Sequence, residues 1–406
     1  MPTEELIPHL FRTEYRKIVS ALCKRFGFAE IEIAEDIASD TFLTAAQTWA
    51  LSGIPPNPAA WLYTVAKNKA KNHFERQRIF DASVAPELQK RINESYEVDL
   101  SEQNMIDSQL QMMFALSHPS IPPEAQIGLS LRILCGFGIE EIADAFLTNK
   151  ETINKRLFRA KAKLRDEHIA IELPSQSEMQ TRMESVLRTI YLLFNEGYYS
   201  VSGNTPLRED LCMEAMRLAM MLIEYPETNK PQANALMSLM CFQASRFSAR
   251  VNSNGEIVLY EDQDESLWDT DLIARGVYFM HRAAQGNRVS KYHLEACIAY
   301  WSTQKTDSID KWENILQFYN QLLQIKYSPI AALNRTYALS KARSVKEAIS
   351  EAEKLDLNDN HFYFTLLGEL YTGIDTMKAK QYFQTAYSLA KSATDKQTIR
   401  KKMDKV

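Results

Sequence analysis

The stretch that decides the fold is residues 138–165, GIEEIADAFLTNKETINKRLFRAKAKLR, which contains two short helical patterns. In the first pattern, apolar side chains recur at positions i, i+3, i+4 and i+7 of one helical face: Ile139, Ile142, Ala143 and Phe146. Gly138 precedes this helix and can cap it, and Glu140 and Glu141 occupy its first turn, where the helix dipole favours acids. The stretch therefore begins with one buried helical stripe.

A second, basic helix follows the three-residue turn of residues 147–149. Thr148 and Glu151 fit a T-x-x-E capping box that starts this helix. Between Lys150 and Arg165 there are seven basic residues and one acidic residue. The apolar positions of this helix form a second buried stripe: Ile153, Leu157, Ala160 and Leu164.

Two short helices, a tight turn and a basic second helix are typical of a helix-turn-helix, whose second helix enters the major groove of DNA. The side chains at exposed or flanking positions are candidates for DNA contact: Lys150, Thr152, Asn154, Lys155, Arg156, Arg159 and Lys163. A solvated basic helix is the plain alternative, since a basic helix alone is usually that. The capping box, the turn length and the preceding helix together favour DNA binding.

The composition of the whole chain predicts a helical protein. The 406 residues include only 12 glycines and 14 prolines, and 45% of them are hydrophobic. We therefore expect an all-α chain of about two to four units, and the composition argues against a Rossmann enzyme, a β-sandwich and a disordered chain. The net charge of −5 requires any nucleic-acid site to be a local patch. No HExxH, GxSxG or P-loop motif is present, so we expect no enzyme activity and no cofactor.

A second basic patch lies between Trp61 and Arg78, with five bases and one acid. It follows residues 52–58, SGIPPNP, the strongest loop signal in the chain. Aromatic and basic residues interleave here, which suits single-stranded DNA because bases stack on rings while cations follow phosphates. The candidates for DNA contact are Lys67, Asn68, Lys71, Asn72, His73, Arg76 and Arg78. Trp61, Leu62 and Val65 are interpreted mainly as core residues.

Several groups of residues resemble one known family. Ile33-x-Glu35-Asp36-Ile37-x-x-x-Thr41-Phe42, followed by Trp61-Leu62-Tyr63-x-Val65-Ala66-x-Asn68, resembles region 2 of the extracytoplasmic-function (ECF) subfamily of sigma-70 RNA polymerase sigma factors. The two helices of residues 138–165 resemble region 4 of these factors. Further motifs are similar to the subgroup with a long C-terminal tetratricopeptide-like extension: Leu116-Ser117-His118-Pro119, Leu193-Phe194-Asn195-Glu196-Gly197-Tyr198 and Glu261-Asp262-Gln263-Asp264-x-x-x-Trp268-Asp269.

The resemblance implies a bacterial sigma factor that binds core RNA polymerase and the −10 and −35 elements of promoter DNA. It implies that the acidic helix of residues 35–47 binds the coiled coil of the polymerase β′ subunit. The β flap is the second polymerase element that the chain is expected to contact. The residues carried over for polymerase binding are Glu35, Asp36, Asp40 and Phe42. The loop 52–58 would receive a flipped base of the −10 element, and its three prolines depart from the family pattern. The helix from Asn149 would read the −35 element.

The chain is expected to contain four segments. Residues 1–78 would form sigma region 2, residues 79–106 an acidic linker that threads the polymerase channel, residues 107–170 region 4, and residues 175–406 a helical extension. Residues 361–391 follow the pattern of a tetratricopeptide helix pair, which predicts an α-solenoid with a groove for a regulatory protein or peptide. Ordinary helical hairpins that fill a core are the alternative.

Two motifs of the extension are candidates for regulation of the sigma module, through Asn195, Glu196, Tyr198, Asp262, Asp264 and Trp268. Their carboxylates could bind a ligand or a metal, although no spacing enforces this and no EF-hand glycine is present, so we expect no metal site. They could also clamp the basic helices of the N-terminal half, or form a solvated loop and a packing motif. The extension is expected to regulate the sigma module because the chain carries no obvious other switch.

A one-component DNA-binding regulator with a helical sensor domain is the second hypothesis. Only a sigma factor needs both the acidic polymerase-binding helix and the strand-opening segment, and the sequence has both. The five cysteines include no pair closer than 29 residues and are interpreted as buried thiols of a reducing cytosol. The start shows no signal peptide, and no apolar run approaches the roughly 20 residues that span a bilayer. A cytoplasmic protein with no membrane partner is expected.

Overall fold

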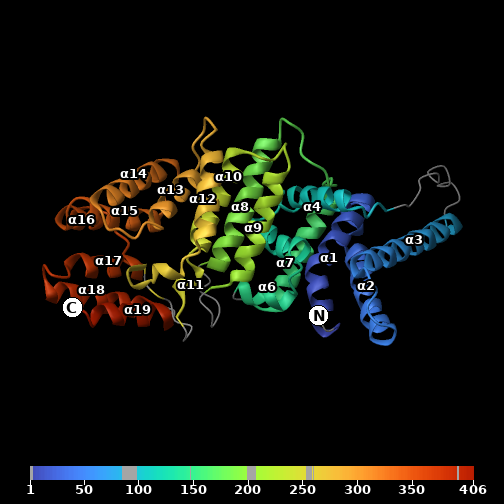
Figure 1. Ribbon diagram of the computed structural model, residues 1–406, viewed down its shortest axis with the longest axis horizontal. Helices are drawn as coiled ribbons and strands as arrows, with labels where there is room; N and C mark the ends of the chain where they lie inside the picture. The colour runs from blue at the N-terminus through green and yellow to red at the C-terminus, as the bar shows by residue number, and fades with distance from the viewer. Residues whose placement is uncertain are drawn as a thin grey trace. The chain divides into compact units, whose positions relative to one another are not determined.

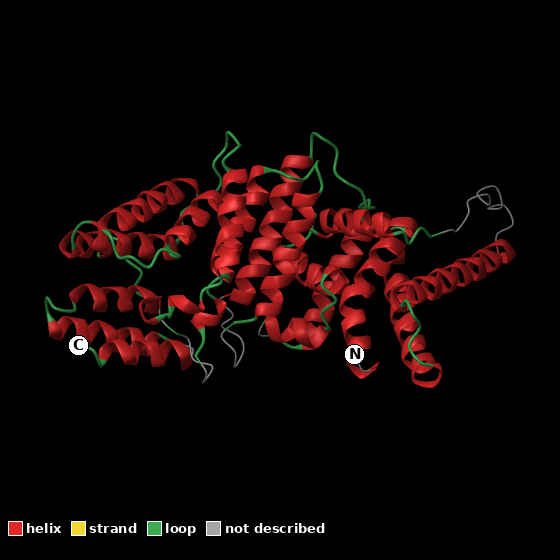
Figure 2. Cartoon of the chain, in the orientation of Figure 1, coloured by secondary structure: helices red, strands yellow, loops and turns green. Residues whose placement is uncertain are grey.

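The computed structural model describes residues 3–84, 98–146, 148–198, 207–252, 258, 260–390 and 393–406. Within these ranges the regular secondary structure is helical and contains no strand, as Figure 2 shows. The all-α prediction is therefore confirmed for the described part of the chain. The chain divides into two compact units, residues 1–193 and residues 194–406, which are described separately.

Unit 1 holds the helices of the N-terminal half, which run from blue to green in Figure 1. Its elements are α1 (Thr3–Phe26), η1 (Phe28–Glu30), α2 (Ile31–Ser52), α3 (Pro58–Val84), α4 (Glu102–Leu116), α5 (Pro123–Leu129), the π-helical turn η3 (Ser130–Leu134), α6 (Ile139–Ala145), α7 (Lys150–Asp166) and the first part of α8 (Met179–Tyr198). The loop between α2 and α3 begins at Gly53, whose φ of 80° lies in the left-handed region that glycine adopts readily.

Helix α1 forms the centre of unit 1. It packs against α2, α3, α4 and η3, and its residues Tyr15, Ile18 and Leu22 are fully buried. An aromatic contact joins α1 to α3: the rings of Phe26 and Phe74 stack, with their centroids 3.6 Å apart. A contiguous apolar core of this kind is the main stabilising feature of a helical unit.

The two helices expected within residues 138–165 are present as α6 and α7, which pack against each other. The cap of α7 differs from the expectation. Asn149, not Thr148, is the N-cap, because its side-chain Oδ1 accepts a 2.8 Å hydrogen bond from the backbone N–H of Thr152. Asparagine ranks with serine and aspartate as an N-cap, so the start of the helix moves by one residue and its basic face is retained.

The start of the C-terminal extension was expected at residue 175, but unit 1 continues to Leu193 in the middle of α8. The Arg182 guanidinium donates a 2.7 Å hydrogen bond to the carbonyl of Phe114, and the Thr189 hydroxyl donates a 3.1 Å bond to the Gln126 side chain. The first part of α8 therefore contacts α4 and α5 inside unit 1.

Unit 2 is an array of antiparallel helices and short turns. After the end of α8, its elements are α9 (Glu209–Glu224), α10 (Pro231–Ala244), α11 (Phe247–Arg250), η4 (Tyr260–Asp262), η5 (Glu265–Leu267), α12 (Thr270–Ala283), α13 (Lys291–Trp301), α14 (Ile309–Ile325), α15 (Pro329–Ala342), α16 (Val345–Ala352), α17 (His361–Tyr371), α18 (Thr376–Leu389) and α19 (Ala393–Met403). From α14 onward each helix packs mainly on its neighbours in sequence, whereas α10 packs mainly on α12 and α13.

The predicted tetratricopeptide pair corresponds to the hairpin of α17 and α18. A Cβ added at Gly368 would lie 2.8 Å from the Phe383 ring, so glycine lets the two helices approach closely. Ala386 is buried in the same core cluster as Phe383, and Ala379 is buried in the cluster of Leu366 and Leu370 of α17. These contacts are those of a packed helical hairpin. They do not test whether unit 2 is an α-solenoid, which stays a prediction.

Four of the five cysteines, at positions 23, 135, 212 and 241, are buried free thiols, and Cys297 is half-buried. Burial raises the pKa of Cys241 to about 12, so its thiol stays protonated near neutral pH. The interpretation as buried thiols is therefore confirmed for Cys23, Cys135, Cys212 and Cys241. None of the helices in the described ranges combines the length and the apolar character needed to cross a membrane.

Candidate functional site

The outer face of α3 carries the first predicted DNA-binding set. Its polar members Asn68, Lys71, Asn72, His73 and Arg76 are exposed. Among the polar candidates, Lys67 is half-buried, and the side chain of Arg78 lies outside the described residues.

Trp61, Leu62 and Val65 are expected to be mainly core residues: Leu62 is buried, and Trp61 and Val65 are half-buried. Phe74 is 7% exposed and stacks on Phe26, while Trp61 meets Trp49 edge to face with the ring centroids 5.3 Å apart. The exposed ring on this face is that of His73, which lies edge to face against Phe74. A base that stacks on this face would therefore meet His73 rather than a buried aromatic ring.

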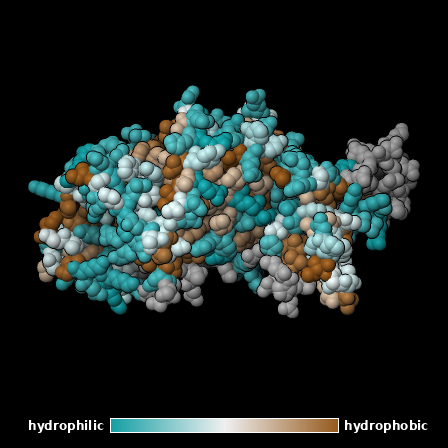
Figure 3. Space-filling view, viewed as in Figure 1, coloured by the Kyte–Doolittle hydropathy of each residue, from teal (hydrophilic) through white to brown (hydrophobic). Residues whose placement is uncertain are grey.

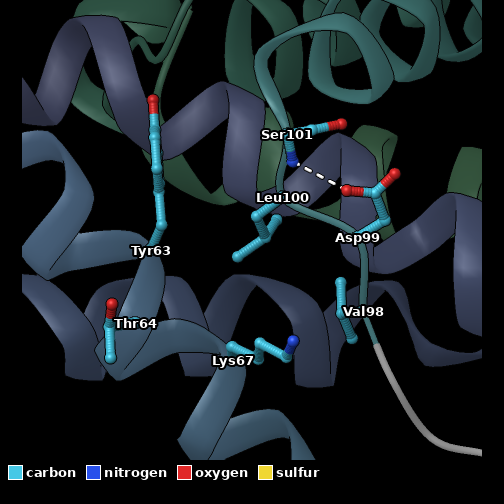
Figure 4. A pocket seen from close by; sticks show the side chains of 7 residues that line it. All are labelled: Tyr63, Thr64, Lys67, Val98, Asp99, Leu100 and Ser101. Carbon is cyan, nitrogen blue, oxygen red and sulfur yellow. Dashed lines mark hydrogen bonds between the residues drawn. The ribbon is translucent and has the colours of Figure 1, made fainter.

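A cavity of about 480 Å³ opens beside α3, where Tyr63, Thr64 and Lys67 face residues 98–101 (Figure 4). The Tyr63 hydroxyl donates a hydrogen bond to the Glu14 carboxylate, and burial together with this bond raises the pKa of Tyr63. On the opposite wall, Asp99 accepts a 2.8 Å hydrogen bond from the backbone N–H of Ser101, which lowers the pKa of the Asp99 carboxyl. The cavity thus presents the Lys67 cation and the Asp99 carboxylate. It lies further along α3 than the loop 52–58, where the resemblance places the site of a flipped base.

Helix α7 carries the second predicted DNA-binding set on a face opposite its buried stripe. Ile153, Leu157, Ala160 and Leu164 are buried as expected. The members of the predicted set that are exposed are Lys150, Thr152, Asn154, Lys155, Arg159 and Lys163.

Three members of this set have partners within unit 1. The Arg156 guanidinium lies 5.4 Å from the Phe146 ring centroid, and the Lys150 ammonium pairs with Glu140. Lys163 pairs with Glu167 one turn away, which raises the pKa of the lysine. These exposed ion pairs are weak, so both lysines can exchange their carboxylate for a phosphate.

Phe158 is a residue of this face that sequence reasoning missed. Its side chain is 61% exposed in the middle of α7. The signal was present in the sequence, because a phenylalanine next to Leu157 falls off the buried stripe of a 3.6-residue period. An exposed ring on a basic helix is an apolar contact surface among cations.

Helix α2 carries the four residues predicted to bind polymerase, of which two are exposed and two are buried. Asp36 and Asp40 are exposed. Glu35 and Phe42 are buried, with 8% and 5% of their surfaces exposed, and their role in polymerase binding stays a prediction. The helical period turns both toward the core of unit 1, where Phe42 meets Phe11 edge to face.

The exposed apolar residue of α2 is Leu43, one position after Phe42, with 57% of its surface accessible. Leu51, at the end of the same helix, is 90% exposed. Figure 3 shows hydrophobic side chains at the surface over α1 and α2. The outer face of α2 therefore combines two carboxylates with apolar side chains, a composition suited to a protein partner.

Glu35 is held by two cations from later helices of unit 1. The Arg132 Nε donates a 3.3 Å hydrogen bond to Glu35 Oε1, and the Lys161 ammonium donates to Oε2. The side chains of Glu35 and Lys161 are 11% and 15% exposed. Tyr15 lies in the same pocket, and burial, followed by the Glu35 charge, raises the pKa of its hydroxyl.

In unit 2, the Asn195–Tyr198 motif is a packing element. Tyr198 is 1% exposed, with the Arg250 guanidinium 3.8 Å from its ring centroid and the Arg246 guanidinium 3.2 Å from its hydroxyl. A Cβ at Gly197 would lie 2.6 Å from the Arg208 carbonyl, so only glycine fits there. Asn195 and Glu196 are half-buried.

Glu196 is the titratable group of this motif. Burial raises the pKa of its carboxyl, and the charge of Arg208 opposes the shift. The carboxyl is therefore a weaker acid than a solvated glutamate.

The acidic motif of residues 261–268 is also tied to the helices around it. Asp264 accepts a 2.9 Å hydrogen bond from the backbone N–H of Ser266 and caps η5, whereas Asp262 is exposed. Trp268 is 7% exposed and stacks on Tyr260, whose hydroxyl accepts a 3.0 Å hydrogen bond from the buried Lys311. Among the described residues, no group of three or more His, Cys, Asp and Glu side chains is placed to hold a metal ion.

Two protein families match parts of the chain. Residues 11–79 match sigma-70 region 2, and residues 182–284 match a family of unknown function, DUF6596. The second match covers the Asn195–Tyr198 and 261–268 motifs. No solved structure gives a significant match to this chain.

Known proteins resemble the chain over different lengths. An uncharacterized protein of Rhizobium meliloti (strain 1021) is 32% identical over 387 residues, which cover 93% of this chain and 90% of that protein. The RNA polymerase sigma-H factor of Pseudomonas aeruginosa is 26% identical over 36% of this chain and 79% of its own length. The ECF RNA polymerase sigma-E factor of Salmonella typhimurium (strain 14028s) is 27% identical over 38% of this chain and 82% of its own length.

Proposed function

Because this chain belongs to the sigma-70 family of RNA polymerase sigma factors, and shares a family over most of its length with the Rhizobium meliloti protein, we propose that it directs promoter-specific initiation by binding core polymerase and the −10 and −35 elements. One observation carries the proposal: the region 2 match falls on α1–α3, which present an acidic face on α2 and a basic face on α3. The chemistry is recognition, and it requires no catalytic residue.

The −35 element would be read by α7. The N-terminal half of a recognition helix contacts base edges in the major groove, while cations nearer its C-terminal end meet phosphates. The exposed Asn154, Lys155 and Arg159 supply hydrogen-bond donors for bases, and Phe158 supplies an apolar contact for a thymine methyl. Arg156 reaches DNA only if it leaves the Phe146 ring.

The −10 element would be bound as single-stranded DNA along α3. Lys71, Asn72 and Arg76 are placed to follow the backbone, and His73 offers the exposed ring. The loop 52–58 is assigned to a flipped base from the resemblance alone. The cavity beside Tyr63 and Lys67 is a second place on the same helix that has room for a base.

Core polymerase would bind the outer face of α2 through Asp36, Asp40 and Leu43. The carboxylates favour a basic partner surface and the leucine supplies apolar contact area. The proposed contact does not rely on Glu35 and Phe42, because both side chains are buried here. The β′ coiled coil is the proposed contact on the polymerase, with the β flap as a second.

Replacing Phe158 with alanine is expected to weaken transcription about 10-fold from promoters whose −35 element places a thymine methyl against the ring, because a base contact contributes about 1–3 kcal/mol. Promoters with cytosine at that position should change little. Run-off transcription on a panel of single-base −35 variants measures the effect. Lys163→Ala is the comparison, since loss of a phosphate contact should weaken all promoters alike, and a uniform loss for Phe158→Ala would contradict the assignment.

The test of the proposed function is initiation in a purified system. Core polymerase plus this chain should produce discrete run-off transcripts from a genomic promoter library, and core polymerase alone should not. The alternative, a one-component regulator, predicts a footprint on duplex DNA by the free chain and no initiation with core enzyme. That result would replace the sigma assignment.

We infer that unit 2 regulates the sigma module, since both candidate motifs lie there within one family match that is separate from region 2. Truncation should follow residue 198 rather than residue 174, because α8 contributes to unit 1 through Arg182 and Thr189. A truncated chain with unchanged promoter output and unchanged response to stimulus would contradict regulation by unit 2.

A further inference from the structure

We propose that unit 2 contains a binding site for a phosphate group, formed by Arg246, Lys311 and the indole N–H of Trp268 around the ring of Tyr260. The ligand is inorganic phosphate or a small phosphate ester, since both present the same group. The proposal goes beyond the proposed function and does not depend on it. The four residues are named the phosphate site below.

The ring of Tyr260 brings these groups together from separate elements of unit 2. The Arg246 guanidinium lies 5.4 Å from the ring centroid, and the Lys311 ammonium lies 5.3 Å from it. The Trp268 ring stacks on that of Tyr260, with the centroids 6.4 Å apart. Arg246 is the N-cap of α11, Tyr260 begins η4 and Lys311 is in the first turn of α14, so only the fold assembles the phosphate site.

Lys311 is a buried cation whose hydrogen-bond acceptors are neutral. The residue is 2% exposed, and its ammonium donates a 3.0 Å hydrogen bond to the Tyr260 hydroxyl and another to the Gln304 carbonyl. These two bonds leave one of the three ammonium protons for a further acceptor. Burial lowers the pKa of the ammonium, and the charge of the exposed Asp307 opposes this shift. A buried charge is costly unless it is compensated, which an anion in contact with Lys311 would do.

Arg246 is a second cation in the same region. Its guanidinium donates a 3.2 Å hydrogen bond to the Tyr198 hydroxyl, while its Nε is buried without a hydrogen-bond partner. Across the part of the chain that the structure describes, neither Arg246 nor Lys311 forms an ion pair with a carboxylate. The charge of Arg246 also lowers the pKa of Lys311, in addition to burial. Two like charges repel each other most strongly where the dielectric constant is low, so this region favours an anion that contacts both.

The motif of residues 261–268 contributes its buried members and not its acids. The four acids of residues 261–265 are exposed, whereas Gln263 and Trp268 are 4% and 7% exposed. Each of these two buried residues has a polar atom without a hydrogen-bond partner among the described residues, Gln263 Oε1 and Trp268 Nε1. Buried polar atoms in native proteins are nearly always paired with protein, water or an ion. A phosphate group that carries one hydroxyl can accept from the indole and donate to the amide oxygen.

The charge of the site fits phosphate better than carboxylate. A phosphate ester carries about −1.5 to −2 charges near neutral pH and three acceptor oxygens, which match two cations and an N–H donor. A carboxylate has one charge and two oxygens. The half-buried Lys305, which donates to the Gln263 carbonyl, is a third cation close to Tyr260 and opposes the rise of the Tyr260 pKa on burial. The plain alternative is that the cations only pack on the ring, which leaves their charge uncompensated.

The test is isothermal titration calorimetry of the full chain with inorganic phosphate, in a phosphate-free buffer at constant ionic strength. The unsubstituted chain should show saturable binding. Lys311→Met removes the ammonium and keeps an apolar side chain, so it should lower the affinity at least about 10-fold through loss of a charge-assisted hydrogen bond. Lys326→Met is the matched control, because Lys326 is exposed at the other end of α14 and its removal should leave the affinity unchanged.

Phosphate should also stabilise unit 2 against heat. At about 100 times its dissociation constant, phosphate should raise the unfolding midpoint of unit 2 in the full chain by about 5–10 °C, and this rise should be lost in Lys311→Met. The proposal is overturned if the unsubstituted chain shows no saturable binding, or if folded Lys311→Met binds as tightly as Lys326→Met. The cations would then have a packing role alone.

Trp268→Phe decides the matter if circular dichroism shows that Lys311→Met does not fold. This variant keeps an aromatic ring and removes the indole N–H, so it should weaken phosphate binding about 3-fold, and an unchanged affinity overturns the site. Glycerol phosphate distinguishes the two sources of the group: binding of the ester indicates a phosphate-bearing small molecule, and binding of inorganic phosphate alone indicates the free ion. Equal affinity for acetate contradicts the phosphate assignment. None of these measurements uses polymerase or DNA, so their failure leaves the proposed function untouched.

Discussion

Replacing both Asp36 and Asp40 with lysine is expected to weaken binding to core polymerase at least about 100-fold and to abolish run-off transcription. Both carboxylates are exposed on α2, and like-charge contacts across an interface cost several kcal/mol. The fold should survive, because Asp40 makes a 4.0 Å surface contact with Lys69, and such pairs contribute little. Fluorescence anisotropy of the labelled chain titrated with core enzyme measures the affinity.

The control must carry the same change in net charge elsewhere on unit 1. Glu124→Lys together with Glu184→Lys fulfils this, since both glutamates are exposed on α5 and α8. This variant should bind core polymerase as the natural chain does. If both variants bound core polymerase as tightly as the natural chain, α2 would not be the docking face. An equal loss of affinity in both would indicate a long-range charge effect.

Replacing Trp268 with alanine is expected to lower the free energy of unfolding of unit 2 by about 3–5 kcal/mol, the usual cost of truncating a buried tryptophan. Its side chain is 7% exposed, stacks on Tyr260 and lies next to helix α12, so its removal leaves a cavity that the loop cannot fill. Calorimetry of the full chain should show the unfolding transition of unit 2 at a lower temperature while that of unit 1 stays in place.

Leu267→Ala is the control for this stability measurement. Leu267 is the adjacent residue and is 50% exposed, so its truncation should change the free energy of unfolding by no more than about 0.5 kcal/mol. If Trp268→Ala were as mild as Leu267→Ala, the tryptophan would not be part of the core, and a ligand-binding role for the acidic motif would regain support.

The difference between Trp268 and its acidic neighbours shows how far a motif can be interpreted without a structure. The sequence places a tryptophan after a run of carboxylates, and this pattern fits a ligand site, a clamp or a packing loop equally well. The structure favours packing, because Lys311 donates a hydrogen bond to the Tyr260 hydroxyl and the buried Trp268 stacks on the Tyr260 ring. Lys311 follows Tyr260 by 51 residues, and no local pattern predicts such a contact.

The exposed face of α7 was predictable, because it depends on residues that are close together in the sequence. Burial of Ile153 and Leu157 follows from a 3.6-residue period, and this period also places Lys155 and Arg159 on the exposed face. The same rule predicts exposure of Phe158. It was missed because a phenylalanine is expected in the core, whereas its position in the helix decides where it lies.

The sequence by itself determined the helical class, the two helices of residues 138–165 and the two basic patches, because helix periodicity, end signals and local charge are properties of neighbouring residues. Only the tertiary structure decided which acids of α2 are exposed. Glu35 and Asp36 are adjacent and chemically alike, yet one is buried between Arg132 and Lys161 and the other faces solvent. The cost of burying a charge is offset only by partners brought close by the fold, and those partners lie about a hundred residues away in the chain.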